Sequence, residues 1–83
     1  GIIMSLSQHV RDSVPMLSKI QVGALSECSD LIDNGYREVF HLVQRDWWFC
    51  KLRHLNNGRT LVLQWRPDYY TLTEGKRTLK VVS

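Results

Sequence analysis

The spacing of apolar residues changes at Gly35, and this change constrains the fold more than any other feature of the chain. Before Gly35, apolar side chains recur every three or four residues, which is the spacing of one helix face. After it, short runs rich in Val, Phe and Trp are separated by turn residues, as is typical of β-strands. Helices that precede strands, rather than alternate with them, predict an α+β fold with one or two N-terminal helices packed on an antiparallel sheet.

The helical part is expected to cover residues 5–34. Its first helix can be capped by the hydroxyl of Ser5 or Ser7. Pro15 lacks an N–H and clashes with the preceding turn, so this helix is expected to end near Asp12 or Ser13.

A second helix is expected over roughly Ala24 to Asp33, because its apolar residues form one stripe. Asn34-Gly35 tolerates the left-handed backbone conformation that commonly ends a helix. The residues of the inward stripe are Leu25, Cys28, Leu31 and Ile32.

Residues 37–82 predict an antiparallel meander of four or five strands. Asn57-Gly58 between two apolar runs is a strong hairpin signal, because a two-residue type I′ turn needs positive φ at both positions. Pro67-Asp68 predicts a turn, and Glu74-Gly75 predicts the last hairpin. The expected strand segments are Arg37–Gln44, Trp47–Leu55, the run after Gly58, Tyr69–Thr73 and Lys76–Val82.

The Asn57-Gly58 turn also predicts a register, with Phe49 opposite Arg66 and Lys51 opposite Gln64. Side chains alternate across a strand, so this hairpin has two distinct surfaces. The surface predicted to be buried carries Trp48, Cys50, Leu52, Leu61, Leu63 and Trp65. The opposite, basic-aromatic surface carries Trp47, Phe49, Lys51, Arg53 and Arg66, with Arg45 and Arg59 at its ends.

The positive charge is concentrated in the strand-rich half. The chain has a formal net charge of +3. Residues 1–36 hold two basic against four acidic side chains, a balance of −2, whereas residues 37–83 hold nine against four, a balance of +5. This asymmetry favours an anionic partner for the sheet.

Several classes of chemistry find little support in the sequence. Cysteine and histidine residues are scattered singly, so neither a metal site nor a cofactor is predicted. Cys50 and His54 share a strand face but lie too far apart for a nucleophile and its base, so the chain is predicted not to be an enzyme. A small ribonuclease-type enzyme, which needs no sequence motif, is the less favoured alternative.

Two cysteines are too few for a disulfide framework, and each stands among apolar neighbours. No apolar run approaches the ~18 residues of a membrane span, and no signal peptide is recognisable. The sequence therefore predicts an intracellular protein, cytoplasmic or nuclear, with no membrane span. A disulfide between Cys28 and Cys50 stays open at this point, because sequence alone gives no distance between them.

The basic-aromatic surface is the strongest functional signal. Tryptophan and arginine are the usual anchors of protein interfaces, so a small non-enzymatic protein-interaction module is the favoured interpretation. Aromatic rings can also stack on bases while Lys and Arg neutralise phosphates, which makes nucleic-acid binding the alternative. A third interpretation is that the N-terminal helix or a partner strand covers Trp47 and Phe49, and that the surface has no direct role.

Residues 35–70 also resemble part of a known family. The stretch from Gly35 to Leu42, followed by the Trp47-Trp48 pair, resembles the middle of an SH3 domain, and Pro67-Asp68-Tyr69-Tyr70 is similar to that family's Pro-x-x-Tyr. The resemblance implies that Trp47, Pro67 and Tyr70 line a groove for proline-rich peptides. The family's Ala-Leu-Tyr-Asp-Tyr motif has no counterpart in this chain.

The remaining expectations concern the chain ends and self-association. Residues 1–83 are expected to form a single domain. Residues 1–3 precede Met4, which is compatible with vector-derived residues ahead of a native start or with a fragment of a longer protein. A chain this short gains limited stability from its core, so a homo-oligomer that pairs edge strand Arg37–Gln44 or Lys76–Val82 is a further expectation.

Overall fold

A computed structural model describes residues 4–83 and shows two helices followed by a five-stranded antiparallel sheet. The prediction of an α+β fold is confirmed, whereas the interpretation of residues 1–3 lies outside the described residues. Neither helix within residues 4–83 is long and apolar enough to cross a lipid bilayer. The elements are α1 (Leu6–Ser13), α2 (Lys19–Asp33), β1 (Tyr36–Gln44), β2 (Trp47–His54), β3 (Thr60–Arg66), β4 (Tyr69–Glu74) and β5 (Arg77–Val82).

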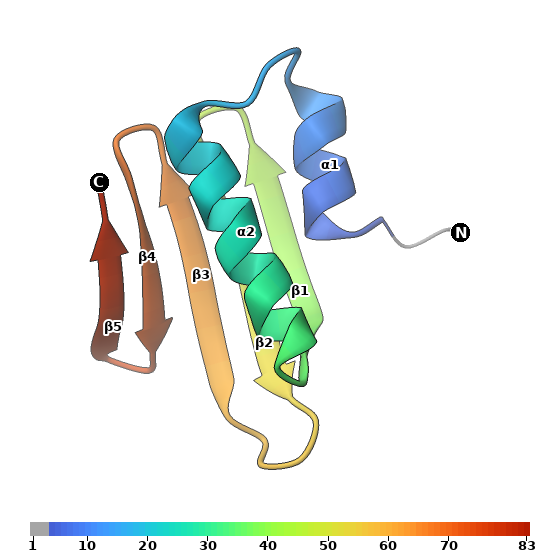
Figure 1. The fold of residues 1–83 in the computed structure, drawn as a ribbon, viewed down its shortest axis with the longest axis vertical. Helices are drawn as coiled ribbons and strands as arrows, with labels where there is room; N and C mark the ends of the chain where they lie inside the picture. The colour runs from blue at the N-terminus through green and yellow to red at the C-terminus, as the bar shows by residue number, and fades with distance from the viewer. Residues whose placement is uncertain (1–3) are drawn as a thin grey trace.

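The sheet is a meander with the spatial order β1-β2-β3-β4-β5, and both helices lie on the same side of it (Figure 1). Helix α2 packs against β1, β3 and β4, while α1 packs against β1. The core fills the space between helices and sheet. It contains Leu6, Val10, Ala24, Leu25, Cys28, Tyr36, Trp48, Cys50, Leu52, Leu61, Leu63, Trp65, Tyr70 and Leu72.

Helix α1 has the bounds that its capping residue and proline predict. The Ser5 hydroxyl accepts a hydrogen bond from the Gln8 N–H at 3.2 Å, which satisfies one of the free donors of the first turn. The helix ends at Ser13, two residues before Pro15.

Helix α2 begins earlier than the apolar stripe predicts. Its N-cap is Ser18, whose side chain accepts from the Gln21 N–H at 3.1 Å, so the helix starts at Lys19 rather than at Ala24. Gly23 therefore lies inside the helix, although glycine is a poor helix former. A Cβ built on Gly23 would lie 3.5 Å from the Tyr70 ring, so the small residue suits the close approach of α2 to β4.

The predicted type I′ turn at Asn57-Gly58 is wrong. Gly58 has φ +72°, but no non-glycine residue of the described chain has positive φ, so Asn57 does not fit that turn. The Gly58 N–H instead donates to the His54 carbonyl, and the His54 N–H to the Arg59 carbonyl, which closes a longer loop. The register shifts by two positions as a result, and Phe49 pairs with Gln64 instead of Arg66. An even shift leaves every side chain on its predicted face.

A bulge at Val39 interrupts the alternation of side chains along β1. Glu38 pairs with Leu52, but Phe40 pairs with Lys51, so one residue of β1 is left over between them. The bulge turns Glu38 towards the helices while Phe40 lies on the opposite side of the sheet. Both surfaces described below depend on this irregularity.

A buried tyrosine ties α2 to the C-terminal strands. The Tyr70 hydroxyl donates to Glu27 Oε1 at 3.1 Å, and the Lys80 Nζ donates to the same oxygen at 2.8 Å. Burial and then the hydrogen bond to Glu27 raise the pKa of Tyr70 above its ordinary value of 10.0. The neutral phenol is therefore the form that the fold favours.

Tyr70→Phe should lower the free energy of unfolding by about 1 kcal/mol, the usual net contribution of such a hydrogen bond. Because the folded-state pKa is raised, the stability linked to neutral Tyr70 is present below about pH 10 and is lost as the pH rises further. Urea titrations across the alkaline range should show a smaller loss for Tyr70→Phe than for the parent. Tyr69→Phe, at the exposed neighbouring position, is the matched control, and an equal effect there would contradict the assignment.

Candidate functional sites

The uncovered side of the sheet, hereafter the open face, gathers aromatic and basic side chains. Strand pairing places on it Arg37, Phe40, Leu42, Gln44, Trp47, Phe49, Lys51, Arg53, Thr60, Val62, Gln64, Arg66, Tyr69, Thr71, Thr73, Thr78 and Val81. Four of these described positions are basic and none is acidic. Four of the nine basic side chains of residues 37–83 therefore lie together on one surface.

Three aromatic rings form the centre of the open face. The Phe49 ring centroid lies 5.8 Å from that of Phe40 and 5.3 Å from that of Trp47. The Arg66 guanidinium carbon lies 5.2 Å from the centroid of the Trp47 ring, a cation–π contact, and the Trp47 Nε1 donates to the Gln64 side chain at 2.7 Å. Phe40 is the most accessible of the three, with 55% of its surface exposed.

Five of the predicted site residues lie on the open face. Lys51, Arg53 and Arg66 are exposed, whereas Trp47 and Phe49 are half-buried against their neighbours rather than under a helix. The interpretation that α1 or α2 covers these rings is wrong, because the helices pack on the other side of the sheet (Figure 1).

The two arginines assigned to the ends of this surface belong to loops. Arg45 lies in the turn between β1 and β2. Arg59 lies in the β2–β3 loop and makes a bidentate ion pair with Glu74, with both contacts at 2.9 Å. Its charge is therefore already paired within the chain.

The residues named by the SH3 resemblance lie on different surfaces. Trp47 is on the open face, Pro67 is in the β3–β4 turn, and Tyr70 is buried against α2. The structure does not bring these three side chains into one groove. The resemblance itself stays a prediction, as does pairing of edge strands between copies of the chain.

Sequence reasoning missed the contribution of β1 to the open face. Phe40 and Leu42 lie there because the bulge at Val39 reverses which side chains of β1 face the helices. Nothing in the sequence of the expected strand indicated this bulge. They add two exposed apolar side chains beside Phe49.

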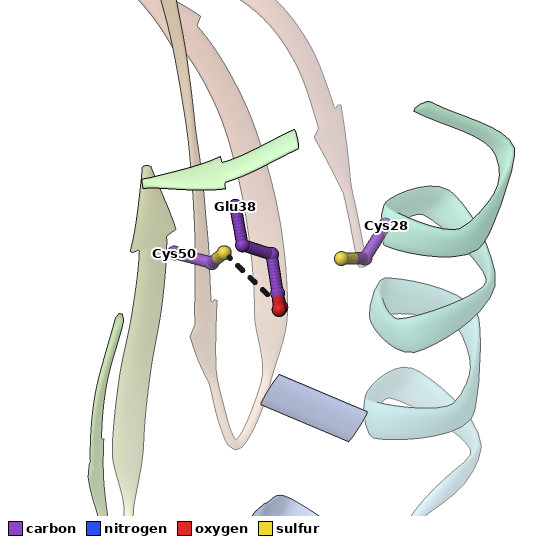
Figure 2. A group of neighbouring side chains, drawn as sticks. All are labelled: Cys28, Glu38 and Cys50. Carbon is purple, nitrogen blue, oxygen red and sulfur yellow. Dashed lines mark hydrogen bonds between the residues drawn. The ribbon is translucent and has the colours of Figure 1, made fainter. Parts of the chain in front are cut away.

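A second candidate site lies on the helix side of the sheet. Cys28 from α2, Glu38 from β1 and Cys50 from β2 point towards one another, and we call them the thiol–carboxylate cluster (Figure 2). One donor atom from each residue lies within 4.8 Å of the other two. The Cys50 Sγ donates to Glu38 Oε1 at 3.6 Å, and the Leu6 N–H donates to the same oxygen at 2.9 Å.

Both thiols of this cluster are free and buried. The neighbouring Cys28 thiol, then burial, then the charge on Glu38, raises the pKa of Cys50 well above its ordinary value. A thiol with a raised pKa keeps its proton at neutral pH, and the protonated thiol is a poor nucleophile.

A cavity of about 380 Å³ leads to the cluster. Cys28 and Glu38 are among its lining residues, together with Arg11. Four serines from the α1 and α2 regions also line it, so its wall is polar as well as apolar. They are Ser5, Ser7, Ser26 and Ser29.

The histidines have other contacts. His9 Nδ1 lies 3.1 Å from His41 Nε2, joining α1 to β1. His54 Nε2 lies 3.1 Å from the Asn34 carbonyl, while its Nδ1 accepts from the N–H groups of Asn56 and Asn57. His54 thus holds the β2–β3 loop against the end of α2.

Comparison with known proteins identifies no relative: no protein-family model, curated protein or solved structure matches the chain.

Proposed function

We propose that this protein is a small interaction module that binds an acidic, partly apolar segment of another protein through its open face. The observation that supports this proposal most directly is the group of aromatic side chains at the centre of the open face. Basic side chains flank this group, and none of the open-face strand positions among the described residues is acidic. Aromatic anchors surrounded by charge are the usual composition of an interface.

The chemistry of the face suggests how a partner would bind. Phe40, Leu42 and Phe49 offer an apolar area from which a partner's side chains would exclude water. Lys51 and Arg53 follow Phe49 along β2 and would pair with the partner's carboxylates. Charge of one sign also steers an acidic partner during its approach.

A protein partner accounts for the aromatic residues better than a nucleic acid does. Base stacking needs a free ring face, but the Trp47 ring already contacts the Arg66 guanidinium and the Phe49 ring. The Trp47 N–H is also occupied by Gln64. Nucleic-acid binding is therefore the second candidate, favoured only by the uniform positive charge.

The proposal can be tested with isotope-labelled protein and three probes. These are a peptide that alternates acidic with apolar residues, a proline-rich peptide, and single-stranded and duplex oligonucleotides. We expect the acidic peptide to shift amide signals of open-face residues in β1–β3 and to leave those of α2 unchanged. Shifts with oligonucleotides alone, weakening steeply with salt, would favour the nucleic-acid alternative. Shifts with the proline-rich peptide alone would favour the peptide class that the SH3 resemblance implies, at a site other than a groove of Trp47, Pro67 and Tyr70.

Reversing the charge of Lys51 and Arg53 together should weaken binding of the acidic peptide by roughly 10-fold or more, because attraction becomes repulsion. The double variant Lys76→Glu with Arg77→Glu is the matched control. It makes the same change in net charge at Lys76 in the β4–β5 turn and at Arg77, the first residue of β5. Titration calorimetry should show nearly unchanged affinity. Equal weakening in both variants would contradict a site on the open face.

A further inference from the structure

We propose that the thiol–carboxylate cluster of Cys28, Glu38 and Cys50 binds one divalent metal ion of the zinc class. The proposal is independent of the open face, which lies on the other side of the sheet. Two sulfur donors and one carboxylate oxygen form a ligand set that suits zinc, whereas oxygen-only sites suit magnesium or calcium.

The spacing of the donor atoms fits a tetrahedral site. With metal–sulfur and metal–oxygen bonds of about 2.3 and 2.1 Å, the ligands of a tetrahedral zinc ion lie roughly 3.6–3.8 Å apart. The Cys50 Sγ and Glu38 Oε1 are already 3.6 Å apart, and no donor of the cluster is more than 4.8 Å from the others. Small side-chain adjustments therefore bring all three within reach of one ion.

The charge of the cluster supports a cation. Glu38 is partly buried where β1 meets the start of α1, and Arg11 lines the same cavity without forming an ion pair with it. The ion pairs found among residues 4–83, Arg59–Glu74 and Lys80–Glu27, do not include it. A divalent ion would neutralise negative charge on this carboxylate and on the thiolates that form when the ion binds.

The cavity between the helices gives the ion a path to the cluster and holds space for a water molecule as the fourth ligand. Cys28 and Glu38 line this cavity, so an ion can reach them without unfolding of the core. Three protein ligands leave one tetrahedral position, which water from the cavity would fill. Each ion bound should displace the two thiol protons to solvent.

The test uses the full chain, reduced and freed of metal by a chelator. Titration with Co²⁺ should produce thiolate-to-cobalt charge-transfer absorption that saturates at one ion per chain. Zn²⁺ should then remove this absorption, and about two protons should be released per ion bound to the metal-free chain. Free zinc at roughly 100-fold above its Kd should raise the folding equilibrium constant about 100-fold.

Variants of the cluster locate the ion. Glu38→Gln keeps an oxygen acceptor for the Leu6 N–H but removes the charge, so the fold should survive, as circular dichroism can verify. Because it changes a direct ligand, its loss of affinity should exceed the roughly 10- to 100-fold that changes in a surrounding shell cause. Cys28→Ser should lose the cobalt absorption, while Glu74→Gln, the same change on distant β4, should leave affinity unchanged.

Three results would overturn the proposal. The first is a folded, reduced chain that gives no cobalt absorption. The second is an affinity that survives Glu38→Gln and Cys28→Ser but falls in His9→Gln, which would assign binding to the His9–His41 pair. The third is a Cys28–Cys50 disulfide, found by mass spectrometry in protein kept under reducing conditions, which would leave no thiolate ligands.

Discussion

Replacing Trp48 with alanine should lower the free energy of unfolding by about 3–5 kcal/mol, the largest loss that we expect from a single substitution. Trp48 is fully buried in the core between the sheet and the helices, and its ring stacks on that of Trp65 with centroids 6.0 Å apart. A chain of this length is stabilised by only roughly 4–12 kcal/mol in total. The variant should therefore be largely unfolded at moderate urea concentrations where the parent is folded.

Two controls separate loss of packing from loss of the indole. The Trp48 Nε1 has no hydrogen-bond partner among the described residues, so Trp48→Phe removes an unsatisfied donor and should cost less than the alanine variant. Trp47→Ala makes the same truncation at the neighbouring residue, which lies on the open face, and should lower the free energy of unfolding by less than Trp48→Ala does. Urea unfolding followed by far-ultraviolet circular dichroism measures all three. Equal losses for Trp47→Ala and Trp48→Ala would contradict the assignment of the two faces.

Local chemistry made much of this fold predictable. Pro15 ends α1, Asn34-Gly35 ends α2, and Pro67-Asp68 joins β3 to β4, each through constraints within a few residues. The faces of the β2–β3 hairpin were also predictable although its register was not. A two-residue shift exchanges cross-strand partners but keeps Trp47 and Trp48 on their expected sides.

Features that depend on distant packing were not predictable in this way. The early start of α2 places Gly23 inside a helix, where its small size suits Tyr70, which is far along the chain. The Val39 bulge decides that Glu38 faces the helices and Phe40 the open face. The meeting of Cys28 with Cys50 follows from the docking of α2 on the sheet. A metal site could not be predicted from these isolated cysteines, because their spacing in the sequence carries no information about how α2 docks on the sheet.

Gly35→Ala should destabilise the protein by about 2–3 kcal/mol, because two costs act at one residue. Gly35 has φ +95°, a conformation that residues with a Cβ rarely adopt. A Cβ there would also lie 2.9 Å from His54 Nε2, so the imidazole would have to move. That ring connects the Asn34 carbonyl to the β2–β3 loop, so its displacement would loosen both the end of α2 and the loop.

Gly58→Ala separates these two costs. Gly58 also has positive φ, +72°, but a Cβ there meets no atom within 4 Å. This variant should therefore lose only the backbone contribution, about 1 kcal/mol. Thermal unfolding of both variants gives the comparison, and the imidazole signals of His54 in NMR spectra should shift in Gly35→Ala much more than in Gly58→Ala. If the two variants lost equal stability and the His54 signals stayed in place, the imidazole would not be the link between α2 and the β2–β3 loop, and backbone strain alone would explain the glycine at position 35.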